Sequence, residues 1–225
     1  MKKYIAISMK PGSTRCKRKN FREIADGVRI WELTFQKAKR LLEDRLVDCV
    51  RVYSSDDDVA QLVENWGFEF SKISVEAERG LESVSLKMAL EEIQDDDWVL
   101  KISVVNPFVK LKTLKKCLAA LENVPAAECA YSMQAILVDK NGLGITWKND
   151  ESRPPTQTLE PVYDLLGTFS VHGFLIKSQR VLTVSRKLIP VTKLESIDID
   201  TEEDFMFAKA LYPNYQEEME CPELS

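Results

Sequence analysis

Short apolar runs alternate along the chain with longer segments of helical periodicity. The first run covers residues 4–9 and is followed at once by the turn sequence KPG, which is typical of a strand buried on both faces. Comparable runs predict further strands over residues 49–53, 98–102, 129–138 and 171–176. Apolar positions three or four residues apart predict helices over residues 24–46, 59–66, 81–93, 111–121 and 204–211. This alternation predicts an α/β fold with a doubly wound, mostly parallel sheet.

The alternation weakens after residue 140. Residues 141–170 contain Pro154, Pro155 and many polar side chains, which predicts a small subregion that protrudes from the sheet. We expect residues 1–212 to form one domain, and residues 213–225 to be an acidic C-terminal tail that frays from its proline onward.

Composition narrows the class of protein. The formal net charge of −5 gives no overall basic field that would favour nucleic acid. The chain has five cysteines, an odd number, and no two of them have C-x-x-C spacing. This favours reduced thiols in a cytoplasmic protein over disulfides or a zinc site. No run approaches the roughly 20 apolar residues of a membrane span. We therefore expect a cytoplasmic protein that binds neither nucleic acid nor a membrane.

A basic loop follows the first predicted strand. Residues 10–20 read KPGSTRCKRKN and include five cations, at Lys10, Arg15, Lys17, Arg18 and Lys19. Ligands of open α/β sheets bind beyond the carboxyl ends of strands, where this loop begins. Gly12 permits close approach of the backbone, and Ser13 and Thr14 add hydroxyl groups, so the loop suits a polyphosphate. It lacks the G-K-[ST] ending of a Walker A loop, and a merely solvated basic loop remains the alternative.

An acidic segment, SIDIDTEEDF, covers residues 196–205. In an extended segment, residues two apart project to the same side, so Asp198 and Asp200 present two carboxylates together. Two hard oxygen ligands suit Mg²⁺ held jointly with substrate phosphates. Thr201 is expected to cap the last helix together with Asp204. The alternative is that the two aspartates only end a strand and begin a helix.

Both segments resemble motifs of the acylneuraminate (CMP-sialic acid) cytidylyltransferases. ISMKPGSTRCKRKN at residues 7–20 is similar, without a gap, to the family's I-P-A-R-G-G-S-K-x-I-P-R-K-N, and the acidic segment keeps every position of the family's S/A-I-D-I-D-T-E-E-D-F. The resemblance implies a Rossmann-like nucleotide-sugar transferase fold and Mg²⁺ (or Mn²⁺) on Asp198 and Asp200. It implies catalytic roles for Lys10, Lys19 and Asp200, and nucleotide binding by Gly12, Ser13, Thr14, Arg15, Arg18 and Asn20.

The resemblance is weak between about residues 70 and 160. Arg79 is the only cation where the family has R-P-x-x-L-A, and Ser103 replaces the Gln of Q-P-T-S-P. Gln157, in TQTLEP, and His172, before a Gly-Phe pair, are the positions similar to those beside the acceptor sugar. Family members contact base, ribose and sugar through the two altered motifs, so the resemblance implies nucleotide binding by Arg79 and Ser103 and substrate contact by Gln157 and His172. The alteration leaves the base and the acceptor open.

The resemblance as a whole implies a homodimeric enzyme that transfers CMP from CTP to an acidic 2-keto sugar and releases pyrophosphate. Two alternatives remain at this stage. One is a nucleotidyltransferase with another base or sugar, and the other is a non-catalytic nucleotide-binding relative. The intact pair of aspartates favours an enzyme, because a protein that only binds nucleotide has little need of two metal-binding carboxylates.

Overall fold

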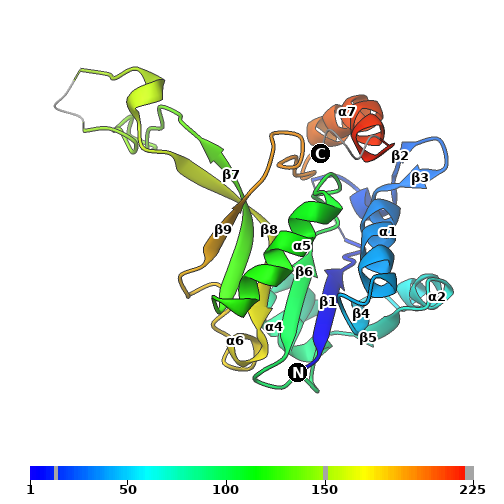
Figure 1. Cartoon of the computed structure of the whole chain (residues 1–225). Helices are drawn as coiled ribbons and strands as arrows, with labels where there is room; N and C mark the ends of the chain where they lie inside the picture. Colours follow the sequence, from blue (N-terminus) through cyan, green and yellow to red (C-terminus); the bar gives the residue numbers. More distant parts are fainter. Residues whose placement is uncertain (13–14, 149–151, 221–225) are drawn as a thin grey trace.

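A seven-stranded mixed sheet forms the centre of the molecule (Figure 1). The computed structural model describes residues 1–12, 15–148 and 152–220. In spatial order the strands are β5 (Glu69–Lys72), β4 (Cys49–Ser54), β1 (Lys3–Ser8), β6 (Trp98–Ile102), β8 (Val162–His172), β7 (Ala126–Met133) and β9 (Lys187–Pro190). Neighbouring strands pair in parallel except at β8, which is antiparallel to both β6 and β7. The predicted doubly wound, mostly parallel sheet is confirmed.

Helices cover both faces of this sheet. They are α1 (Ile30–Glu43), α2 (Asp58–Asn65), α3 (Val75–Arg79), α4 (Glu82–Ala89), α5 (Leu111–Ala119), α6 (Gly173–Lys177) and α7 (Glu202–Glu220). Alternate residues of β1 enter two separate cores: Ile5 and Ile7 pack in the core that includes α1 and α5, and Tyr4 and Ala6 pack in the core that includes α4 and α6. This burial on both faces explains why the strand reads as a continuous apolar run. Within the described residues, no helix is both long enough and apolar enough to cross a membrane.

The helix predicted over residues 24–46 is wrong in its first part. A small hairpin of β2 (Glu23–Ala25) and β3 (Val28–Arg29) precedes α1. Gly27 has a φ of 72°, in the left-handed region that an Asp-Gly hairpin turn requires. The helix then starts at Ile30, where the Glu32 carboxylate accepts a hydrogen bond of 2.6 Å from the Arg29 N–H.

The strand predicted over residues 171–176 is also wrong in part. β8 ends at His172, and α6 begins at Gly173. A Cβ at Gly173 would lie 1.9 Å from the carbonyl oxygen of Gln94, so only glycine fits where the chain turns into this helix. The Gly173 N–H donates to the Asp97 carbonyl at 2.8 Å, which fixes the turn.

A two-stranded arm projects from one side of the sheet (Figure 1). It consists of the outer ends of β7 and β8 and of the described residues between them, 134–148 and 152–161. The predicted protrusion is therefore confirmed, although its bounds shift from 141–170 because residues 162–170 belong to β8. The arm carries exposed apolar side chains at Val138, Leu143, Ile145, Tyr163 and Leu165.

The last helix is longer than predicted. The expectation that the chain frays from Pro213 is wrong, because α7 continues through this proline to Glu220. Proline removes one backbone hydrogen bond from a helix interior. Burial of tyrosines on either side offsets that cost: Tyr212 is buried, and the ring of Tyr215 lies 5.0 Å from that of Phe108, centroid to centroid. Residues 221–225 of the predicted tail lie outside the described residues.

Tyr215→Ala tests this packing. Tyr215 is only 3% exposed, so we expect the free energy of unfolding to fall by about 3 kcal/mol, as for other large core truncations. Phe207→Ala, at a residue of the same helix that is 58% exposed, is the matched control and should change the free energy by less than about 0.5 kcal/mol. Urea unfolding followed by circular dichroism measures both, and equal losses would contradict a packed helix beyond Pro213.

Candidate active site

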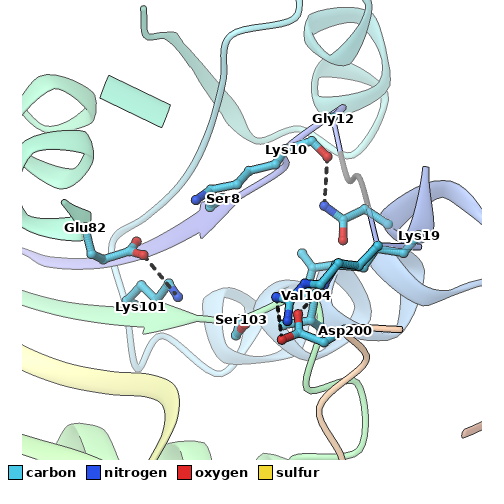
Figure 2. A pocket seen from close by; sticks show the side chains of 12 residues that line it. Ser8, Lys10, Gly12, Lys19, Glu82, Lys101, Ser103, Val104 and Asp200 are labelled. Carbon is cyan, nitrogen blue, oxygen red and sulfur yellow. Dashed lines mark hydrogen bonds and ion pairs between the residues drawn. The ribbon is translucent and has the colours of Figure 1, made fainter. Parts of the chain in front are cut away.

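A cleft of about 370 Å³ lies at the carboxyl ends of β1 and β6 (Figure 2). β4 and β5 lie on one side of β1, and β6 begins the other half of the sheet, so the cleft sits where the strand order reverses. Such switch points are where open α/β sheets bind ligands. The predicted site residues that line the cleft are Lys10, Gly12, Arg15, Lys19, Asn20, Ser103 and Asp200.

Lys19 joins the basic loop to the acidic segment. Its Nζ donates to the Ile199 carbonyl at 2.5 Å and to Asp200 Oδ1 at 2.7 Å. Arg15 Nη2 donates to Asp200 Oδ2 at 2.7 Å, so each carboxylate oxygen of Asp200 contacts a cation. Burial alone would raise the pKa of Asp200, but the hydrogen bonds and charges of Lys19 and Arg15 outweigh it and hold the pKa below its usual value. The cleft therefore keeps an ionised carboxylate beside two cations.

Local structure in the loop directs Lys19 inward. A 3-10 turn over Lys19–Phe21 follows Arg18, whose φ of 51° is left-handed. Asn20 Nδ2 donates to the Lys10 carbonyl at 3.0 Å and so ties the two ends of the loop together. Asn20 is 5% exposed, and its buried Oδ1 has no hydrogen-bond partner among the described residues. The wall of the cleft thus carries a polar acceptor at a fixed place.

Backbone and side-chain contacts anchor the acidic segment. The Ile199 N–H donates to the Val105 carbonyl at 2.9 Å, which places this segment beside the end of β6. Thr201 and Asp204 form the expected cap, with the Thr201 N–H 2.8 Å from Asp204 Oδ2 and the Asp204 N–H 3.2 Å from Thr201 Oγ1.

A buried glutamate secures the same segment from behind. Glu195 accepts hydrogen bonds from the Thr113 hydroxyl at 2.5 Å, the Lys110 N–H at 3.0 Å and the Thr192 N–H at 2.9 Å. Lys110 and Thr113 belong to the start of α5, so Glu195 links that helix end to the chain just before the two aspartates.

The pKa of the Asp198 carboxyl is raised by burial and by the charge of Asp200. Loss of water around its carboxylate is the main cause that raises the pKa of Asp198 to about 6, and the negative charge of Asp200 is the next. Asp198 is exposed as a residue, and unlike Asp200 it is not among the residues that line the cleft. Mutual repulsion of this kind arises when two carboxylates lie close together.

The two aspartates suit a magnesium ion in their donor chemistry. The described residues hold no cluster of three or more His, Cys, Asp or Glu side chains placed for a metal. Mg²⁺ does not need one, because proteins bind it through one or two carboxylates, substrate phosphates and water. Asp198 and Asp200 therefore fit an ion that is completed by a bound substrate.

Several predicted residues do not come to the cleft. Arg18 lies 5.8 Å from the ring of Phe21, in a separate depression. Arg79 is exposed at the end of α3, and Gln157 is exposed on the arm, in a turn over Thr156–Thr158. Ser13 and Thr14 lie outside the described residues.

His172 lies at the end of the sheet opposite the cleft. It pairs with Trp98, the first residue of β6, whereas the cleft is at the other end of that strand. One ring nitrogen, Nε2, is 3.0 Å from the Leu121 carbonyl oxygen. The predicted contact of His172 with substrate in this cleft is therefore not supported by its position, because its ring has a structural partner elsewhere.

Two charged residues of the cleft were missed in the sequence. Glu82 is the first residue of α4, and Lys101 lies within β6. They are nineteen positions apart, so no local motif contains both. The one signal was a lysine inside the otherwise apolar strand WVLKI, since a buried charge needs a partner.

Comparisons with known proteins agree with this fold. A model of the cytidylyltransferase family matches residues 5–153, and the chain belongs to this family. Among solved structures, CMP:2-keto-3-deoxy-manno-octonic acid synthetase complexed with CTP is similar, with a TM-score of 0.68, 13% identity, and coverage of 95% of this chain and 99% of that one.

A second similar structure is 4-diphosphocytidyl-2C-methyl-D-erythritol synthase from Anaerococcus prevotii. Its TM-score is 0.66 at 16% identity, with 94% of this chain and 98% of that one covered. At such low identity these two likenesses bear on the fold alone. No curated protein matches the sequence.

Glu195→Ala tests how the acidic segment is anchored. Removing the carboxylate leaves two hydroxyls and two backbone N–H groups without this acceptor, so we expect the free energy of unfolding to fall by about 3 kcal/mol. Glu160→Ala, at an exposed residue, is the control and should cost less than about 0.5 kcal/mol. Urea unfolding would contradict the anchor if the two variants proved equally stable.

Proposed function

We propose that this chain is a cytidylyltransferase that transfers CMP from CTP to an acidic 2-keto sugar of the sialic-acid type and releases pyrophosphate. The observation that carries the proposal is the contact of Lys19 and Arg15 with Asp200 in a cleft at the switch point of the sheet. Membership of the cytidylyltransferase family supports CTP as the donor. A similar fold in a synthetase named for a 2-keto sugar acid supports the acceptor class.

The reaction follows from the charges in the cleft. The acceptor hydroxyl oxygen forms a bond to the α-phosphorus of CTP, the bond from that phosphorus to the bridging oxygen breaks, and pyrophosphate leaves while the hydroxyl proton passes to water. Lys10, Arg15 and Lys19 bind the negative charge that gathers on the departing phosphates. Mg²⁺ or Mn²⁺, held by Asp198 and Asp200, would neutralise phosphate charge and orient in-line attack.

We further propose that two copies of the chain associate through the arm, in the cytoplasm. The exposed apolar side chains of the arm, named above, support this contact because such a patch is unfavourable in water. Gln157 lies on the same arm, away from the cleft of its own chain. A contact of Gln157 with the acceptor would then come from the second copy. Nucleic acid and membranes are not among the proposed partners.

The second candidate is a relative that binds nucleotide without turnover. It is favoured by Arg79, which lies outside the cleft, and by Asp200, whose two oxygens already contact cations. Pyrophosphate release separates the two candidates. With Mg²⁺, each of the four nucleoside triphosphates and a panel of sialic-acid-like sugars, we expect release with CTP and one sugar acid. CTP-dependent stabilisation in a thermal shift, without release across the panel, would favour the second candidate.

Asp200→Asn tests the proposed metal ligand. We expect pyrophosphate release to fall at least about 100-fold, as when one charge-stabilising group is removed from an active site. The melting temperature should change by less than about 3 °C, because the pair with Arg15 is exposed and the asparagine oxygen still accepts a hydrogen bond from Lys19. Asp96→Asn, at an exposed residue just before β6 and at the end of that strand opposite the cleft, is the control and should keep full activity. Wild-type turnover in Asp200→Asn would contradict the assignment.

Removal of divalent cations tests the same assignment without a mutation. EDTA should abolish pyrophosphate release, and an excess of Mg²⁺ or Mn²⁺ should restore it, because the two carboxylates are expected to act only through an ion shared with the phosphates. The circular dichroism spectrum should stay unchanged throughout. Full activity in the presence of the chelator would overturn the requirement for a metal.

A further inference from the structure

A polar cluster occupies the end of the cleft away from Asp200. Figure 2 shows Glu82 and Lys101 facing each other there, with Lys19 and Asp200 on the other side. The Tyr53 hydroxyl donates to Glu82 Oε1 at 2.7 Å, and Lys101 Nζ lies 3.7 Å from Glu82 Oε2. We call Tyr53, Glu82 and Lys101 the distal cluster.

The distal cluster is fixed by its surroundings. Lys101 Nζ donates to the Gly167 carbonyl at 2.9 Å, and Gly167 has a φ of 64°, a conformation that presents this carbonyl to the lysine. Lys101 is 7% exposed, and Tyr53 is fully buried. Glu82 belongs to the first turn of α4, where the helix dipole favours a negative charge. A rigid acceptor and a rigid donor therefore stand side by side at the cleft.

Glu82 is ionised in this setting. Burial would raise the pKa of Glu82, but the charge of Lys101, the hydrogen bond from Tyr53 and the charge of Lys10 together bring it below its usual value. The 3.7 Å separation from Lys101 is an ion pair beyond hydrogen-bond distance. A carboxylate accepts about four hydrogen bonds and an ammonium donates three, so both groups keep capacity for a ligand.

An acceptor beside a donor matches a ligand edge that offers a donor beside an acceptor. Cytosine has this edge, since its exocyclic amino group lies next to the ring nitrogen N3, which is an acceptor, and a carboxylate is a known partner of that amino group. Uracil carries a carbonyl oxygen at the same position, as thymine does, and this oxygen would face the negative carboxylate. Discrimination of this kind rests as much on the repelled competitor as on the favoured ligand.

We propose that Glu82 accepts a hydrogen bond from the amino group of the base while Lys101 donates to the neighbouring acceptor, so that the distal cluster selects CTP over UTP. This inference rests on the proposed function and names residues that determine its specificity. Amino-substituted bases are favoured in general, and the two pyrimidine nucleotides give the closest comparison of shape.

The ionised Glu82 favours the uncharged base at this end of the cleft. In the proposed reaction the triphosphate lies at the other end, beside Arg15, Lys19 and the carboxylates that would hold the metal, and Glu82 repels phosphate from its own end. It equally repels the carboxylate of an acidic sugar. The base is the uncharged part of the proposed substrates, so it alone approaches Glu82 without electrostatic cost.

Calorimetric titration of the full chain with CTP and with UTP, in the presence of Mg²⁺, tests the inference. The wild-type chain should bind CTP at least about tenfold more tightly than UTP. In Glu82→Gln the side-chain amide still accepts from Tyr53 but also donates to the uracil oxygen, so the ratio of the two dissociation constants should fall about tenfold. Glu76→Gln, at an exposed residue of α3, is the matched control and should keep the wild-type ratio.

The outcomes separate this inference from the proposed reaction. Equal affinity of the wild-type chain for CTP and UTP, no binding of either nucleotide, or an unchanged ratio in a folded Glu82→Gln overturns the role of the distal cluster. If Glu82→Gln fails to fold, the wild-type comparison still decides. If the ratios are as expected but no sugar supports pyrophosphate release from CTP, the proposed transfer reaction is contradicted and the selection of the base is not. Release from CTP with an unchanged ratio in Glu82→Gln would remove only the inference.

Discussion

The contact of Lys19 with the segment at Ile199 and Asp200 is the interaction on which the site depends. It joins two parts of the chain that are 180 residues or more apart, and one ammonium group binds both a backbone carbonyl and a carboxylate. The side chain of Lys19 is only 13% exposed, so this ion pair is less screened by solvent than a surface pair. Arg15 and Arg22 also form ion pairs with this part of the chain, but the cation of the Lys19 pair is the least exposed of the three.

Charge compensation explains how an acidic chain maintains a cationic cleft. The start of α7 supplies the balancing carboxylates, since Glu202 pairs with Arg22 at 2.5 Å just as Asp200 pairs with Arg15 and Lys19. The guanidinium of Arg22 also lies 3.8 Å from the ring centroid of Phe205. The cations of the loop are thus held in place by local partners, and the net charge of the whole chain does not determine what the cleft attracts.

Local sequence patterns predicted the frame of the molecule and the side of the cleft near Asp200. The apolar runs of β1, β4 and β6 were readable because each strand is buried on both faces, and the acidic segment was readable because its two aspartates are two residues apart. The β2–β3 hairpin was missed although Asp26-Gly27 is a hairpin signal, because apolar spacing on either side of it suggested a longer helix. Tertiary packing of tyrosines, which no local pattern encodes, carries α7 past Pro213. The distal cluster escaped notice for the same reason, since Tyr53, Glu82 and Lys101 meet only in the folded chain.

The most direct test of the account is a crystal structure of the chain with Mg²⁺ and a CTP analogue that cannot release pyrophosphate. The account predicts phosphate oxygens within hydrogen-bond distance of Arg15 and Lys19, the metal on Asp198 and Asp200, and the cytosine amino group on Glu82. A nucleotide bound outside this cleft, or bound with its phosphates at the Glu82 end, would contradict it.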